Sequence, residues 1–271
     1  MFRYKDIITR WINKPQKIYD NLRMRFRNYR HHFENVQQCV KRYGTYPYPK
    51  YMVLEDKRLV YLEVPKVANC SIKGSMLKQS FQDDYSVQNE SLKYTVHVLG
   101  KRYKDYYRFT FVRNPFERLV SCYESKYHKD KKMIGTPYMK EMTYEYYLFG
   151  YLRKDRGFTN FICRIALIPN AYKDHHFKPQ TSIVYNADGK CNVDFVGRYE
   201  HLEKEFEKII SKYELGKLPM YNKTQYKNYM DYYNVFTARL AYFIYKDDIN
   251  KFGYEEEYKR LLKYVKNKVK R

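Results

Sequence analysis

Two apolar runs that each end at a basic residue place the strongest constraint on how this chain can fold. Residues 59–73 read LVYLEVPKVANCSIK, and residues 108–127 read RFTFVRNPFERLVSCYESKY. Each begins as a short buried strand would and passes through a tight turn into a helical pattern. In the second, Asn114 can cap the helix, Pro115 fits its first position, and Glu117 can complete a capping box. The sequence therefore predicts two strand-to-helix junctions.

A third junction extends the alternation of strands and helices. The segment NVDFVGRYE (192–200) predicts a strand that leads into HLEKEFEKIISKY, where the apolar residues share one helix face. A final helix is expected at Val235–Asp247. Strands that alternate with helices predict an α/β fold in which a central, mostly parallel sheet is flanked by helices.

Length and hydropathy predict one main domain with an N-terminal extension. A chain of 271 residues with 44% hydrophobic residues can bury one sizeable core. Residues 1–50 predict a basic helical arm, which is compatible with peripheral membrane contact, and residues 51–271 predict the main domain. There is no run of 18 apolar residues, so no transmembrane segment is expected, and the N-terminus lacks the pattern of a signal peptide.

The charge balance points to anionic partners. Lys and Arg number 53 against 30 Asp and Glu, which gives a formal net charge of +23. This surplus suits nucleic acid, an acidic membrane surface, a polyanionic substrate or a nucleotide, although a solvated basic surface explains it equally well. The cysteines lack C-x-x-C spacing, which predicts reduced thiols and no zinc site; they are Cys39, Cys70, Cys122, Cys163 and Cys191.

The two junctions carry the residues that a pair of anion sites would need. Helices that follow parallel strands direct backbone N–H groups and a positive helix end toward the carboxyl edge of the sheet. Lys66 supplies a point charge, Arg113 a planar fork for phosphate, and Ser121 a hydroxyl two turns along the same helix. Ser125 is expected to be an ordinary helix-face residue. Further donors are the N–H groups of Ala68, Asn69, Cys70 and Ser71. Two separated anion sites indicate a nucleotide with phosphates at both ends.

Four ordered segments resemble the carbohydrate sulfotransferases, the Golgi membrane-bound group that includes chondroitin, HNK-1 and heparan 2-O enzymes. VPKVANCSIK resembles their 5′-phosphosulfate loop, and FVRNPFERLVSCYESKY resembles their 3′-phosphate motif. HFKPQTSIVYNADGKCNVDFVGRYEHLEKEF and IYKDDINKFGY resemble two later motifs of the same group. The resemblance runs in order from about residue 59 to residue 254, which is far more specific than any one short motif.

The resemblance implies a P-loop-like three-layer fold and transfer of a sulfuryl group from PAPS (3′-phosphoadenosine 5′-phosphosulfate) to a carbohydrate hydroxyl, with no metal. It assigns the 5′-phosphosulfate to Lys66 and the loop residues Ala68, Asn69, Cys70 and Ser71, and it makes Lys66 catalytic as well. It assigns the 3′-phosphate to Arg113 and Ser121. A histidine is suited to act as the general base. His97, in KYTVHVLGKRY, is favoured slightly over His176, in HFKPQ.

The resemblance further implies a glycan or glycolipid acceptor, and an acidic acceptor would explain part of the basic charge. No nucleic-acid partner is expected, because no RNP, zinc-finger or KH-type signature accompanies the charge. The relatives have an N-terminal membrane anchor, and none is expected in this sequence. Met1 and the cysteines therefore favour a soluble bacterial or viral relative in the cytoplasm, with the Golgi expected only if an anchor has been removed. Two alternatives stay open: a P-loop-like kinase, which would need a glycine-rich loop, and a basic nucleic-acid-binding protein.

Overall fold

The computed structural model describes most of the chain beyond the predicted arm. The described residues are 49–79, 81, 83–127, 152, 156–186, 188–219 and 228–269, together with 34, 37, 38 and 41. The prediction of a basic helical arm at residues 1–50 therefore falls almost wholly outside the described residues.

A five-stranded sheet forms the centre of the fold, in the order β3-β1-β2-β4-β5. The strands are β1 (Tyr51–Leu54), β2 (Leu59–Leu62), β3 (Thr95–Val96), β4 (Tyr107–Val112) and β5 (Phe195–Arg198). β4 pairs in parallel with both β2 and β5, whereas β1 pairs antiparallel with β2 and β3. The predicted α/β class is confirmed, and the sheet is mixed because residues 55–58 join β1 to β2 as a hairpin, a connection too short for a parallel crossover.

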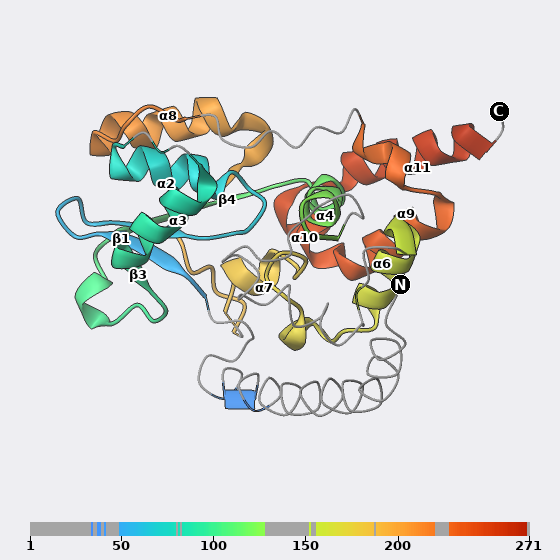
Figure 1. Ribbon diagram of the computed structural model, residues 1–271, viewed down its shortest axis with the longest axis horizontal. Helices are drawn as coiled ribbons and strands as arrows, with labels where there is room; N and C mark the ends of the chain where they lie inside the picture. Colours follow the sequence, from blue (N-terminus) through green and yellow to red (C-terminus); the bar gives the residue numbers. More distant parts are fainter. Residues whose placement is uncertain are drawn as a thin grey trace, which may run out of the picture.

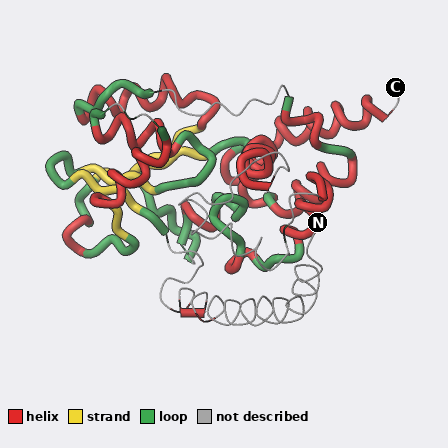
Figure 2. The backbone as a smooth tube through the Cα atoms, in the orientation of Figure 1, coloured by secondary structure: helices red, strands yellow, loops and turns green. Residues whose placement is uncertain are grey.

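Helices cover the sheet and extend beyond the ends of its parallel strands. They are α2 (Asn69–Leu77), α3 (Asp84–Ser91), α4 (Pro115–Cys122), α6 (Gly157–Ala166), α7 (Thr181–Val184), α8 (Leu202–Tyr213), α9 (Val235–Ile244), α10 (Lys246–Phe252) and α11 (Glu255–Val269). Figure 1 shows α2, α3 and α8 together above the sheet, and α4 with α9 to α11 beyond the end of β4. Figure 2 shows the strands gathered in one half of the molecule and most helices in the other.

The helix expected as the last one, Val235–Asp247, is wrong in two respects. α9 ends at Ile244, because Tyr245 leaves the helical conformation with φ −112° and ψ 22°. Two further helices then follow, and Asp247 lies in the first turn of α10. No helix among the described residues has the length and apolar character to cross a bilayer.

The core lies on both sides of the sheet. Every residue of β2 is 0% exposed, so both faces of this central strand are covered, as in a layered α/β protein. On the α8 side, Phe206 packs its ring 5.9 Å from the rings of both Phe109 and Phe111 in β4. These contacts pack α8 against β4, the strand that leads to Arg113.

The two strand-to-helix junctions that carry Lys66 and Arg113 are confirmed, with one correction. β2 is followed by α2, and β4 by α4, where the Asn114 side chain accepts a hydrogen bond from the N–H of Phe116. The predicted capping box is wrong. Glu117 forms an ion pair with Arg113 at 2.7 Å, and the Asn114 N–H donates to Glu200 at 2.7 Å. Glu200, 86 residues away in sequence, therefore accepts the hydrogen bond from the N-cap N–H that the capping-box pattern assigned to Glu117.

Candidate active site

The loop between β2 and α2 has a strained backbone suited to an anion. Lys66 and Ala68 both have positive φ, 71° and 52°. Each such residue with a Cβ costs about 1–2 kcal/mol, and strain of this kind is typical of ligand sites. Ala68 is the N-cap of α2 and makes no side-chain cap hydrogen bond, so the first-turn N–H groups at the positive helix end belong to Asn69, Cys70 and Ser71.

Two side chains of the predicted loop are engaged in holding it. The Asn69 Oδ1 accepts a hydrogen bond from the Tyr61 hydroxyl at 2.6 Å, and the Cys70 Sγ accepts one from the Gln88 amide at 3.2 Å. Ser71 is buried in the first turn of α2. Asn69 and Cys70 can therefore serve an anion through their backbone N–H groups, while their side chains fix the loop to β2 and α3.

The Lys66 side chain contacts Ser125, which was expected to be an ordinary helix-face residue. Its Nζ donates a hydrogen bond to the Ser125 Oγ at 2.9 Å. Ser125 lies in a π-helical turn, Tyr123–Tyr127, that continues α4. The expectation that Ser125 is an ordinary helix-face residue is therefore wrong, because the wider turn directs it at Lys66. Single-turn π-helices are frequent at functional sites.

Arg113 joins the two junctions. Its Nη1 donates to the Lys66 carbonyl at 3.2 Å, its Nη2 pairs with Glu117, and the guanidinium lies 4.3 Å from the centre of the Tyr199 ring. The ion pair with Glu117 is also what an ordinary helix-flanking arginine would make. The contact to Lys66, however, shows that the two junctions meet at one edge of the sheet. Ser121 is buried on α4, the helix that Arg113 precedes.

His97 lies at the same edge of the sheet, two strands away from β2. It follows β3, whose Val96 pairs with Tyr51 of β1, and Tyr51 in turn pairs with Leu62 at the end of β2. The His97 Nδ1 is 3.0 Å from the carbonyl oxygen of Pro49. Strands lie about 4.8 Å apart, so His97 is about 10 Å from the β2 junction along the sheet.

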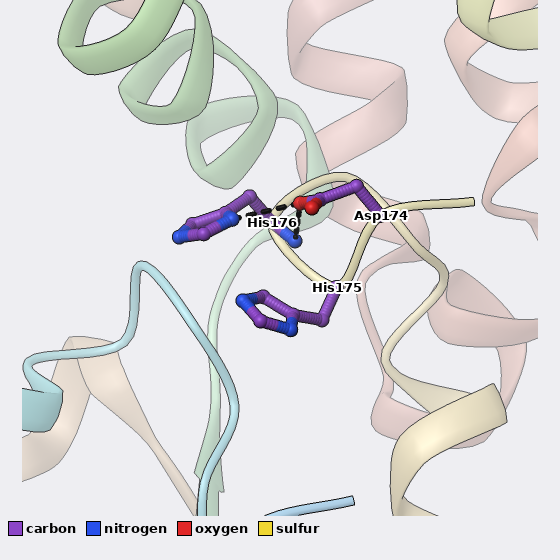
Figure 3. A group of neighbouring side chains, drawn as sticks. All are labelled: Asp174, His175 and His176. Carbon is purple, nitrogen blue, oxygen red and sulfur yellow. Dashed lines mark hydrogen bonds and ion pairs between the residues drawn. The ribbon is translucent and has the colours of Figure 1, made fainter. Parts of the chain in front are cut away.

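His176 belongs to a compact group with its two preceding residues. Asp174 is fully buried, and its Oδ1 lies 2.7 Å from the His176 Nδ1 and accepts from the His176 backbone N–H at 2.8 Å. The rings of His175 and His176 are 4.4 Å apart, and Figure 3 shows both extending from this loop to the same side. A proton on Nδ1, donated to Asp174, leaves Nε2 as the proton-accepting nitrogen of His176.

Burial and nearby positive charges favour the neutral form of His176. Burial lowers the pKa of His176 well below its usual value of 6.5, and the positive charges of Lys126, Lys66, Arg118 and Lys50 lower it further. Asp174, His175 and His176 could offer metal ligands, since their ligand atoms lie within 4.8 Å of one another. The same cations would repel a divalent metal, so the electrostatics favour an anion here.

Arg118 connects the β2–α2 loop to the histidine loop, and sequence reasoning missed it. It is 1% exposed, and its guanidinium donates to three carbonyl oxygens: Pro65 at 2.9 Å, Lys178 at 2.8 Å and His175 at 2.7 Å. Nothing in the sequence distinguishes this arginine from the solvated charges usual on amphipathic helices. Its three contacts hold His176 and Lys66 in one site.

Comparison with known proteins agrees with this geometry. Residues 49–255 match the group described as "Sulfotransferase family". The chain therefore belongs to the sulfotransferase family, which confirms the family predicted from the four motifs.

Several similar curated proteins bear the name carbohydrate sulfotransferase. "Carbohydrate sulfotransferase 11" of Rattus norvegicus is 32% identical over 189 residues, covering 59% of this chain and 52% of the relative. "Carbohydrate sulfotransferase 12" of Xenopus laevis is 23% identical over 255 residues, covering 75% and 60%. "Carbohydrate sulfotransferase 10" of Xenopus laevis is 23% identical over 241 residues, covering 75% and 67%. The chain spans about half the length of the first of these relatives. No solved structure is a significant match.

Proposed function

We propose that this protein transfers the sulfuryl group of PAPS to a hydroxyl of a carbohydrate acceptor. The proposal rests on family membership, on the names of the relatives, and above all on the contact between the Arg113 guanidinium and the Lys66 carbonyl. That contact brings the two cationic junctions together, and a nucleotide with phosphates at both ends needs two anion sites close enough to bind it at once.

Different residues bind the two ends of the nucleotide. Lys66 and the first-turn N–H groups of α2 hold the 5′-phosphosulfate, whereas Arg113 and Ser121 hold the 3′-phosphate. The nucleotide supplies an activated sulfuryl group. Lys66 stabilises the negative charge that develops on the 5′-phosphate as its bond to sulfur breaks. This chemistry depends on positioning and electrostatics and needs no metal ion in the proposal.

We further propose His176, in place of the slightly favoured His97, as the general base. Arg118 bonds the residues that directly precede Lys66 and His176, and Asp174 orients the His176 ring. The acceptor oxygen forms a bond to sulfur, the bond between sulfur and the 5′-phosphate oxygen breaks, and the hydroxyl proton passes to the His176 Nε2. The products are a sulfate ester and 3′-phosphoadenosine 5′-phosphate (PAP). The side chain is 19% exposed, which lets it return the proton to solvent.

Nucleotide binding is the first test. Titration calorimetry should show that the protein binds PAP without added metal. Lys66→Ala and Arg113→Ala should each weaken binding at least tenfold, since a charge-assisted contact is worth about 1.5–3 kcal/mol. Lys101→Ala, at an exposed lysine, is the matched control and should bind PAP normally. Stabilisation by ATP and magnesium but not by PAP would instead indicate a kinase.

Transfer of radiolabelled sulfate from PAPS to a panel of glycans tests the base. His176→Gln should lower kcat by roughly 100- to 10,000-fold while leaving the Kd for PAP nearly unchanged, because a general base contributes to the chemical step. His97→Gln should change kcat only a few-fold. The reverse result would assign the base to His97, and full activity of both variants would exclude both histidines.

Salt dependence tests whether the acceptor is acidic. If basic residues that contribute to the net charge of +23 bind an acidic glycan, the KM for that acceptor should rise steeply with ionic strength, because salt screens exposed charges. The buried nucleotide site should respond less. An acceptor KM that does not change with salt would argue for a neutral glycan or glycolipid.

A further inference from the structure

Asp248 is a buried carboxylate far in sequence from the residues it supports. It lies in α10 and is 0% exposed. Its Oδ1 accepts hydrogen bonds from the N–H and the hydroxyl of Thr181, each at 2.8 Å. Its Oδ2 accepts from the Gln180 N–H at 2.8 Å and from the Gln180 side-chain amide at 3.4 Å. These contacts fix both the backbone and the side chain of Gln180.

Gln180 in turn binds the backbone of Arg113 on both sides. Its Oε1 accepts from the Arg113 N–H at 2.9 Å, and its Nε2 donates to the Arg113 carbonyl at 2.8 Å. The ladder between β4 and β5 ends at the pair Val112 and Arg198, one residue earlier. The Gln180 side chain therefore bonds the backbone N–H and carbonyl of Arg113 at the point where β5 stops pairing with β4.

We propose that Gln180 and Asp248 are positioning residues for recognition of the 3′-phosphate. They hold the Arg113 backbone in the one orientation that aims its guanidinium at the phosphate. The guanidinium lies at the end of a long side chain, so a rotation of about 10° at the backbone would displace it by about 1 Å, which is enough to spoil a phosphate contact. The inference rests on the proposed function and extends it to residues 67 and 135 positions after Arg113 in sequence.

Comparison of two nucleotides separates positioning from general stabilisation. PAP and AMP differ only in the 3′-phosphate. Calorimetry on the full chain should show that Asp248→Asn weakens PAP binding about tenfold but AMP binding less than twofold, because the asparagine amide would direct a donor at N–H groups that need an acceptor. Asp247→Asn, at the exposed neighbour on α10, is the matched control and should leave both affinities unchanged.

A second variant covers the case in which Asp248→Asn does not fold. Gln180→Met keeps the side-chain volume and removes both contacts to Arg113. It leaves Asp248 with its contacts to Thr181 and to the backbone N–H of residue 180. It should show the same selective loss of PAP affinity, and in an Arg113→Ala background it should cause no further loss. Equal weakening of PAP and AMP, or additive losses in the double variant, would overturn the proposal. Failure of the unaltered chain to bind PAP would overturn the proposed function itself.

Discussion

Replacement of Arg118 with lysine tests whether this buried side chain holds the two halves of the site together. The arginine makes three hydrogen bonds, of 2.7–2.9 Å, to carbonyl oxygens on two separate loops. Lysine keeps the positive charge but carries its donors on a single nitrogen, so it cannot match the planar fork that reaches three directions. We expect it to keep one of the three bonds and to leave two carbonyls buried without a donor.

The size of the effect follows from these contacts. A hydrogen bond to a charged group contributes about 1.5–3 kcal/mol, so the loss of two lowers the free energy of unfolding by about 3–6 kcal/mol. For a chain of this length, that change should lower Tm by about 5–10 °C. PAP binding should weaken as well, because Pro65 precedes Lys66 in the loop that Arg118 holds.

Chemical denaturation and differential scanning calorimetry can measure the change. The matched control is Arg102→Lys, an arginine whose side chain is 67% exposed and which pairs with Glu55 at 2.9 Å. Exposed pairs contribute little, so the control should unfold like the unaltered protein. If Arg118→Lys were no less stable than Arg102→Lys, the buried contacts would not carry the energy assigned to them.

Three further predictions follow from single residues. Gly197→Ala should destabilise the fold by about 1–3 kcal/mol or more, because its Cβ would overlap the Phe111 ring; Gly100→Ala, with nothing within 4 Å, should be neutral in thermal unfolding. Ala68→Gly should raise the free energy of unfolding by up to about 1 kcal/mol by relieving the left-handed strain, and a loss would contradict that conformation. Because burial and nearby cations lower the pKa of His176, kcat/KM should stay level as pH falls through 6.5 and decline only below it. A decline of kcat/KM that begins at or above pH 6.5 would exclude His176 as the general base, because His176 is expected to be neutral at that pH.

Local chemistry explains why the junctions could be predicted from sequence. Buried strands are rich in apolar residues. Leu59–Val64 is apolar except for Glu63, and Arg108–Val112 carries three apolar residues in five, although β2 ends at Leu62. The start of α4 follows from Asn114 and Pro115, whose capping properties need no tertiary information. Lys66 and Arg113 could be placed at one edge of the sheet because adjacent parallel strands end on the same side.

The supporting contacts could not be predicted, because they depend on residues far apart in sequence. Gln180 meets Arg113 across 67 residues, and Arg118 meets Pro65 across 53. A single sequence carries no signal for such pairs. The strand β1 was missed for a different reason: Tyr51–Leu54 lies between two prolines and a charged turn, which together resemble a loop. The choice between His97 and His176 likewise depends on tertiary surroundings that spacing does not encode.

The side-chain contacts at the end of β4 have a consequence for the kinetics of association. Gln180 bonds the N–H and the carbonyl of Arg113, and Glu200 bonds the N–H of Asn114. The pairing of β4 with β5 can therefore end there while these backbone groups stay bonded. A nucleotide that binds at this edge does not have to break strand-to-strand hydrogen bonds of Arg113 or Asn114. We therefore expect its capture to proceed as docking to a rigid surface, at a rate set by diffusion, orientation and electrostatic attraction.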